Sequence, residues 1–152
     1  MDMWKCHSQE KQHPIPDEDT LWFWEGCRRQ RLLIQHCDAC QRFRFPPSPM
    51  CPYCLSTLYT WQDDPGRGEV QTYCVYYAEL AGPAWGAALP YVVAIIRLHH
   101  SGVRMLSNLV CKEVRMARIG LPVRVIFDRL DTGVTLPKFI PHVPLEAIGK
   151  EG

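Results

Sequence analysis

The chain has 152 residues, which is enough for one domain or two small ones, and its formal net charge of +1 indicates neither a nucleic-acid nor a membrane-surface partner. No apolar run approaches the ~18 residues of a membrane span, and the charged N-terminal residues lack the apolar stretch of a signal peptide. We therefore expect a cytoplasmic protein whose eight cysteines are reduced thiols rather than a disulfide scaffold.

A helix is predicted over residues 17–31, after a flexible tail over residues 1–16. Asp17 follows a proline and is suited to cap the helix, because its carboxylate can accept a backbone N–H. Residues at helical spacing form the predicted buried face: Thr20, Phe23, Trp24 and Cys27. The helix has more aromatic surface than a small core needs, which indicates docking on another protein. The candidate docking residues are Leu21, Trp22, Phe23 and Trp24.

Two C-x₂-C pairs form the most specific feature of the chain and lie within residues 32–65: Cys37, Cys40, Cys51 and Cys54. Each pair can place two thiolates on one side of a metal ion, and together they form a tetrahedron of sulfurs that suits Zn²⁺. A single pair would also fit a redox dithiol, but a thioredoxin-type pair needs no second copy. We predict a structural zinc in a two-hairpin or rubredoxin-like ribbon, with iron in the same cage as the open alternative.

The rest of the chain, residues 66–141, is predicted to be a small β-barrel followed by a tail over residues 142–152. Candidate strands lie at residues 69–77, 91–99, 103–110, 123–130 and 134–140, separated by turn signals and without alternating helices. Five short strands in this pattern favour an OB-fold, although an SH3-like barrel also fits. The predicted class is therefore mainly β, with an N-terminal helix, a zinc ribbon and a five-stranded barrel.

Several short stretches keep a recognisable order and spacing around the cysteine frame: FWEG at 23–26, FPP at 45–47, GRG at 66–68, PYVVA at 90–94 and IGLPV at 119–123. Over residues 17–141 the chain resembles the acyl-CoA-associated family with a rubredoxin-like zinc ribbon followed by an OB-fold, long catalogued as a domain of unknown function. One departure concerns the residue after each C-x₂-C pair, often glycine in such knuckles because the turn favours a positive φ. Here these residues are Gln41 and Leu55.

The resemblance implies a non-catalytic accessory subunit with a larger enzyme as its partner. Members of the family accompany thiolases or lipid-transfer-type retro-aldolases, including ones of steroid side-chain degradation, and some accompany a hotdog-fold enoyl-CoA hydratase. The small subunit docks on the catalytic dimer, expected here as a heterotetramer, and shapes the acyl-CoA site. Candidate residues for acyl-CoA or partner contact are Arg44, Phe45, Pro46 and Pro47, with Gly82, Pro83 and Trp85 from the first barrel loop.

No catalytic constellation is evident in the sequence, which has neither a nucleophile elbow, nor a phosphate loop, nor an H-E-x-x-H motif. The main alternative is a single-stranded nucleic-acid-binding protein, because OB-folds stack bases on aromatic side chains. The residues for such a platform would be Tyr73, Tyr76, Tyr77 and Trp85. Arg97 and Arg104 lie near them in the sequence, but there is no lysine stripe. We therefore expect nucleic acid to be an unlikely ligand.

Overall fold

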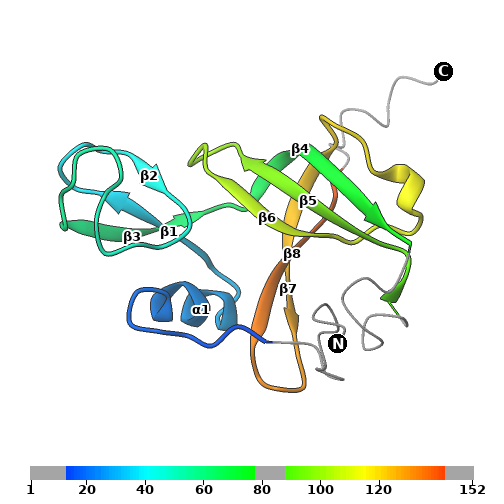
Figure 1. Ribbon diagram of the computed structural model, residues 1–152, viewed down its shortest axis with the longest axis horizontal. Coiled ribbons are helices and arrows are strands. Elements are labelled where there is room, and N and C mark those ends of the chain that lie inside the picture. The colour runs from blue at the N-terminus through cyan, green and yellow to red at the C-terminus, as the bar shows by residue number, and fades with distance from the viewer. Residues whose placement is uncertain (1–12, 78–87, 143–152) are drawn as a thin grey trace, which may run out of the picture.

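The computed structural model describes residues 13–77 and 88–142, which form the α-helix α1, a short 3₁₀ helix called η2, a three-stranded sheet and a closed five-stranded barrel (Figure 1). The expected class, with its N-terminal helix, ribbon and barrel, is confirmed. Gly82, Pro83 and Trp85 lie outside the described residues. No helix in the described part is long and apolar enough to cross a membrane. The elements are α1 Leu21–Arg28, β1 Leu32–Cys37, β2 Phe43–Arg44, β3 Tyr59–Asp64, β4 Arg67–Tyr76, β5 Tyr91–Leu98, β6 Arg104–Leu109, η2 Val114–Met116, β7 Pro122–Arg129 and β8 Thr135–Pro141.

Helix α1 is shorter at both ends than the segment predicted from the sequence. Asp17 does make a cap-type contact, since its Oδ1 accepts the backbone N–H of Thr20 at 2.9 Å, but a separate turn precedes the helix. The end is set by Gln30, whose φ of 59° is left-handed. The N–H of Gln30 donates to Cys27 O and that of Arg31 to Gly26 O, which is the Schellman pattern that ends a helix.

The ribbon is an antiparallel sheet in the order β2–β1–β3. Strand β1 pairs with β3 along its whole length, from Leu32 opposite Asp64 to Cys37 opposite Tyr59. Leu32 and Ile34 are fully buried and belong to the same core cluster as the barrel residues Val70 and Phe139. The ribbon therefore shares its hydrophobic core with the barrel instead of forming a separate one.

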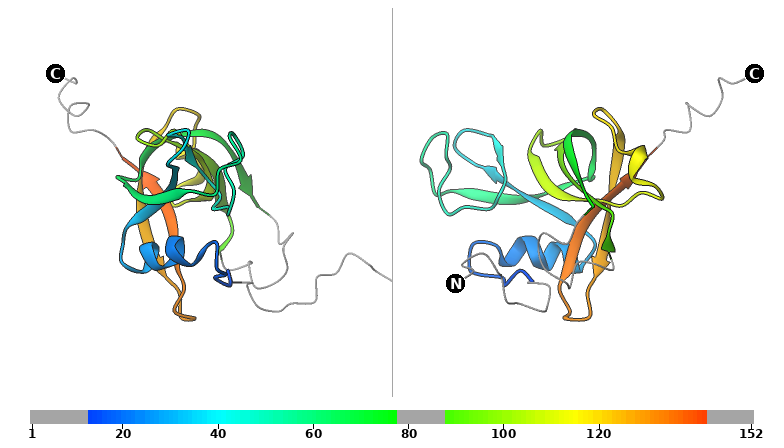
Figure 2. Two further views of the ribbon diagram at one scale, coloured as in Figure 1. Left: turned by 90° about the vertical axis from the view of Figure 1, so that its left-hand side faces the viewer. Right: turned by 45° about the vertical axis from the view of Figure 1, so that its right-hand side comes forward.

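The barrel closes in the order β4–β5–β6–β8–β7, as expected of an OB-fold. Its closure uses a parallel pairing of β6 with β8 at Leu109 and Phe139. Strand β5 alternates buried and less buried residues along its length, as a half-buried strand should. Its inward side chains are Val92, Ala94, Ile96 and Leu98. Figure 2 shows the ribbon and α1 together on one side of the barrel.

A short junction fixes the ribbon against the barrel. Gly66 has a φ of +67°, and a Cβ added there would lie 2.1 Å from Val125 Cγ1, so only glycine fits. Asp64, at the end of β3, is only 5% exposed. Its Oδ1 accepts the Gly66 N–H at 2.8 Å and its Oδ2 accepts the Ser101 N–H at 3.1 Å. One carboxylate thus joins the ribbon, the linker and the β5–β6 turn.

We predict that Asp64→Asn destabilises the fold by about 1–3 kcal/mol, because the amide turns an N–H₂ group toward a buried backbone donor. The neighbouring Asp63→Asn is the matched control. Asp63 pairs with Arg31 at the exposed surface, where an ion pair contributes about 0–1 kcal/mol. Urea unfolding of the two variants measures the difference. Equal losses of unfolding free energy would show that the Asp64 junction is not a specific stabilising contact.

Candidate functional site

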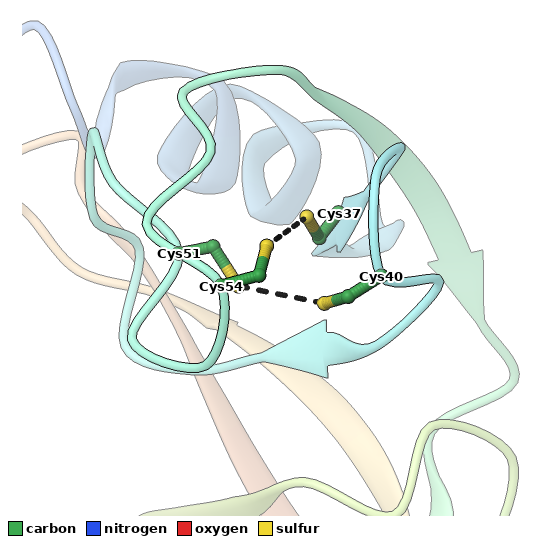
Figure 3. A group of neighbouring side chains, drawn as sticks. All are labelled: Cys37, Cys40, Cys51 and Cys54. Atoms are coloured by element: carbon green, nitrogen blue, oxygen red, sulfur yellow. Dashed lines mark hydrogen bonds between the residues drawn. The ribbon is translucent and has the colours of Figure 1, made fainter.

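The four frame cysteines meet at one end of the ribbon (Figure 3). Their sulfurs all lie within 4.8 Å of one another, with Cys37 and Cys54 at 3.6 Å and Cys40 and Cys51 at 3.7 Å. A tetrahedral zinc with Zn–S bonds of ~2.3 Å requires sulfurs ~3.8 Å apart. The measured spacing therefore fits a structural zinc with all four positions taken by the protein. Such a site has no open position for substrate chemistry.

The turn after each cysteine pair has the backbone conformation anticipated from the sequence. Gln41 has a φ of 59° and Leu55 a φ of 63°, although neither is glycine. Their N–H groups donate to Cys37 O and Cys51 O, both at 2.9 Å, and so close the two knuckles. Each left-handed non-glycine residue costs on the order of 1 kcal/mol, which metal binding of ~10 kcal/mol or more offsets.

The electrostatics of the cluster favour a cation. A backbone N–H of Cys40 lowers the pKa of the Cys37 thiol. For Cys51, burial opposes ionisation, but the N–H groups of Tyr53 and Cys54 bring its pKa down to about 6. Burial raises the pKa of Cys40 to about 12. Backbone N–H groups and burial therefore shift the pKa values of these cysteines in opposite directions. Zinc binds cysteine as the thiolate and releases its proton, so metal affinity rises with pH and falls in acid.

Arg44 is buried, with only 3% of its surface exposed, and its side chain stabilises the loop between the cysteine pairs. Its Nε donates to Gln35 Oε1 at 2.8 Å, its Nη2 donates to Ser48 O at 2.9 Å, and its guanidinium lies 4.8 Å from the ring centroid of Tyr59. Gln35 Oε1 also accepts the Ser48 N–H at 2.9 Å. The side chain expected to contact a ligand or a partner is thus largely committed to holding its own loop.

The loop that Arg44 stabilises packs against the helix. Phe45 is half-buried, and its ring centroid lies 5.4 Å from that of Phe23. Pro46 is exposed and Pro47 is half-buried. Together with α1, β6 and β8, this loop encloses an apolar pocket of 290 Å³ that Trp24 and Leu106 also line. The predicted contact loop therefore lies at a surface, beside the predicted docking helix.

The structure separates the four docking candidates of the helix. Leu21 is 51% exposed and Trp22 is 54% exposed. Phe23 is only 4% exposed and belongs to the core, and Trp24 is half-buried against it with ring centroids 5.0 Å apart. Leu21 and Trp22 are therefore the helix residues that offer apolar surface to another molecule.

The tyrosines considered for base stacking do not form a free platform in the described part. Tyr76 stacks on Tyr91 across the β4–β5 pair, with centroids 5.0 Å apart and the rings inclined by 9°. One face of Tyr76 is thereby covered. Tyr73 and Tyr77 are exposed, but Arg97 is engaged by Glu69 at 2.6 Å. This arrangement is not the shared aromatic and basic groove that single-strand binding requires.

Sequence reasoning missed a cleft between the ribbon and the barrel. It has a volume of 950 Å³ and is lined by residues of the cysteine-frame loops and of the β5–β6 turn, among them Arg42, Tyr53 and Arg104. The lining residues come from two segments, 41–53 and 101–104, which lie far apart in the sequence and share no motif. Asp64 holds the β5–β6 turn against the ribbon, and Phe43 of β2 contacts His100 of that turn with ring centroids 5.6 Å apart.

Comparison with known proteins identifies the family. A family model described as "ChsH2, rubredoxin-like zinc ribbon domain" matches residues 24–60, and one described as "ChsH2, C-terminal OB-fold domain" matches residues 61–128. A solved chain described as "Ltp2-ChsH2(DUF35) aldolase" is 36% identical, with a TM-score of 0.77 over 86% of this chain and 100% of that chain. The chain belongs to the ChsH2 family.

Other similar proteins share the fold or part of the sequence. A "Probable enoyl-CoA hydratase alpha subunit" of Thermomonospora curvata is 36% identical over 88% of this chain and 40% of its own length. The "3-oxo-4,17-pregnadiene-20-carboxyl-CoA hydratase alpha subunit" of Mycobacterium tuberculosis is 32% identical over 75% of this chain and 35% of its own length. This member of the ChsH2 family thus spans less than half the length of these two curated relatives. A DUF35-family protein of Sulfolobus solfataricus, at 15% identity and a TM-score of 0.61 over 82% of this chain, shares the fold.

We predict about one zinc per chain, held by Cys37, Cys40, Cys51 and Cys54. Cys40→Ser should lose the metal and destabilise the ribbon, because a structural zinc contributes directly to folding. Cys74→Ser is the matched control, since Cys74 is an exposed barrel cysteine outside the cluster. Elemental analysis and thermal unfolding with and without a chelator provide the measurements. Stoichiometric zinc in a variant lacking all four cluster cysteines would contradict the assignment.

Proposed function

We propose that this chain is a non-catalytic accessory subunit of an acyl-CoA enzyme and docks on a larger catalytic subunit. The observation that carries the proposal is the match to the whole length of a chain from an aldolase whose name joins two proteins, Ltp2 and ChsH2. The names of the two curated relatives, both alpha subunits of CoA-thioester hydratases, support the same role. A zinc site closed by four cysteines is consistent with it, because such a site supports structure rather than chemistry.

We infer that the partner is a thiolase-superfamily aldolase rather than a hydratase. The name of the solved chain, an aldolase, supports this partner, because the match extends over 100% of that chain at 36% identity. The expected assembly is a heterotetramer of two catalytic and two accessory chains. The steroid carboxyl-CoA in the name of one relative makes a steroid side-chain thioester the first substrate to test.

The exposed face of α1 and the adjoining loop are the surface that we assign to this partner. Leu21 and Trp22 are the exposed apolar residues of α1. The same helix contributes Phe23 and Trp24 to the apolar pocket that the loop over residues 45–47 also lines. Exposed aromatic residues and apolar pockets are both typical of protein–protein interfaces. The zinc ribbon would fix the conformation of this surface, because Arg44 and Ser48 of the loop both donate hydrogen bonds to Gln35 of β1.

Co-expression with thiolase-like and hydratase-like subunits tests the proposed function. The chain should co-purify with the thiolase-like subunit and should turn over no acyl-CoA by itself, while the complex cleaves or processes the thioester. Turnover by the isolated chain, or stable association with a hotdog-fold hydratase and not with a thiolase-like subunit, would contradict the proposal.

We predict that Trp22→Ala weakens the complex by about 1–3 kcal/mol, the range for losing an aromatic anchor at an interface. Because Trp22 is half-exposed, the unfolding temperature of the isolated chain should change little. Ile119→Ala is the control, since Ile119 is an exposed apolar residue ahead of β7 and outside the assigned surface. Affinity is measured by titration of the partner subunit. Unchanged affinity in the Trp22 variant would place the interface elsewhere.

A further inference from the structure

Strand β5 is apolar on both of its faces. Val92, Ala94 and Ile96 point into the barrel, and the residues between them, Val93 and Ile95, lie on its outer side. An antiparallel strand with one face on the core and the other in water normally alternates apolar and polar residues. The sequence of β5 therefore indicates that the outside of the barrel also packs against something.

The neighbouring strands extend this apolar character across the sheet (Figure 1). Residues directly opposite each other in an antiparallel pair share one face. Two adjacent rows on the outside of β4, β5 and β6 are therefore Cys74, Val93 and Asn108, and Thr72, Ile95 and Leu106. None of these six residues is charged, and we call them the outer-sheet patch. Contiguous apolar surface of this kind is typical of an interaction site.

A row of charged residues borders the outer-sheet patch. Glu69, Arg97 and Arg104 form the next row on the same three strands. Glu69 pairs with Arg97 at 2.6 Å, but no carboxylate of the described residues pairs with Arg104. Like charges directly opposite in a sheet are destabilising, and Arg104 lies directly opposite Arg97. A carboxylate of another molecule beside Arg104 would remove this cost.

The outer-sheet patch adjoins the surface assigned to the catalytic subunit. Leu106 and Asn108 belong to the patch and also line the apolar pocket beside α1. A stable protein–protein interface buries about 800 Å² of each partner and uses about 20–30 residues a side. The exposed large apolar residues of α1 are Leu21 and Trp22, which with the short loop over residues 45–47 fall well below this size. An interface that begins at the helix therefore needs more surface, and the outer-sheet patch provides it.

The charges disfavour a second copy of this chain as the occupant of the patch. In a twofold contact each copy would present the same patch and the same charged row. The single acidic side chain of that row, Glu69, already pairs with Arg97. A second copy would therefore bring further arginines and no free carboxylate from this row to Arg104.

We propose that the outer-sheet patch is the second part of the interface with the catalytic subunit, which presents an apolar surface bordered by a carboxylate that pairs with Arg104. The identity of the partner rests on the proposed function. In this arrangement the catalytic subunit contacts both α1 and the barrel. The shared core holds these two elements in one arrangement, because Phe23 of α1 packs in the same cluster as the barrel residues. Interfaces with an apolar centre and arginine beside it are common in protein complexes.

Thiol alkylation of the native complex tests the proposal without altering the patch. Cys74 is exposed, so N-ethylmaleimide should label it in the isolated chain. In the complex with the thiolase-like subunit, labelling of Cys74 should slow at least tenfold, as measured by mass spectrometry of its peptide. Ile119→Cys provides the matched control, because residue 119 is exposed outside both surfaces and should be labelled equally in the two states. Equal labelling of Cys74 in the two states would overturn the proposal.

Charge substitutions test the two parts of the surface separately. Thr72→Lys places a charge in the patch and Arg104→Glu reverses the charge at its border, and each should weaken binding of the thiolase-like subunit by about tenfold or more. Both positions are exposed, so the unfolding temperature should stay close to that of the parent. Arg118→Glu is the matched control, since Arg118 is an exposed arginine outside the patch, and it should bind like the parent. Unchanged affinity in both test variants would contradict the assignment.

Failure of this proposal can be distinguished from failure of the proposed function. A complex that Trp22→Ala weakens but in which Cys74 stays reactive would refute only the patch assignment. A parent chain that binds no thiolase-like subunit would refute the proposed function and with it the partner named here. Dimerisation of the isolated chain that Thr72→Lys abolishes would assign the patch to a second copy instead. Anionic lipid vesicles that protect Cys74 from labelling would assign it to a membrane surface, and either result would overturn the proposal.

Discussion

The shared hydrophobic core of the ribbon and the barrel is the constraint on which the rest of this structure depends. Leu32 and Ile34 enter that core at the start of β1, and the same strand ends at Cys37 in the sulfur cluster. One strand of six residues therefore connects the metal centre to the barrel interior. A ribbon this small could not bury enough apolar surface by itself, so it relies on the sulfur cluster at one end and on the barrel at the other.

The loop over residues 45–47 separates two surfaces of different character. Phe45 and Pro46 line both the apolar pocket beside α1 and the cleft between the ribbon and the barrel. Arg44 and Ser48 tie this loop to Gln35 in the middle of β1. The proposed partner surface and the cleft between the ribbon and the barrel therefore share one wall, which hydrogen bonds to β1 hold in place.

Features encoded by local spacing were predictable from the sequence, and features produced by distant contacts were not. The cysteine frame, the left-handed residues after each pair and the five strands all follow from short patterns. The end of α1 was not predictable, because it depends on Gln30 adopting a conformation usually taken by glycine. The burial of Arg44 depends on Gln35 and Tyr59. The cleft between the ribbon and the barrel depends on the contacts of Asp64 and Phe43 with the β5–β6 turn. None of these pairings leaves a local signature.

The close approach of Gly66 to Val125 limits where the ribbon and the barrel can be separated from each other. The two family models meet between residues 60 and 61, yet this position lies inside β3, and the physical junction comes only after Asp64. Recombination between residues 60 and 61 would therefore cut a paired strand and separate Asp64 from Leu32, its partner in β1. The ribbon and the barrel can be inherited as separate sequence segments only if the donor brings the whole of β3 with its glycine linker.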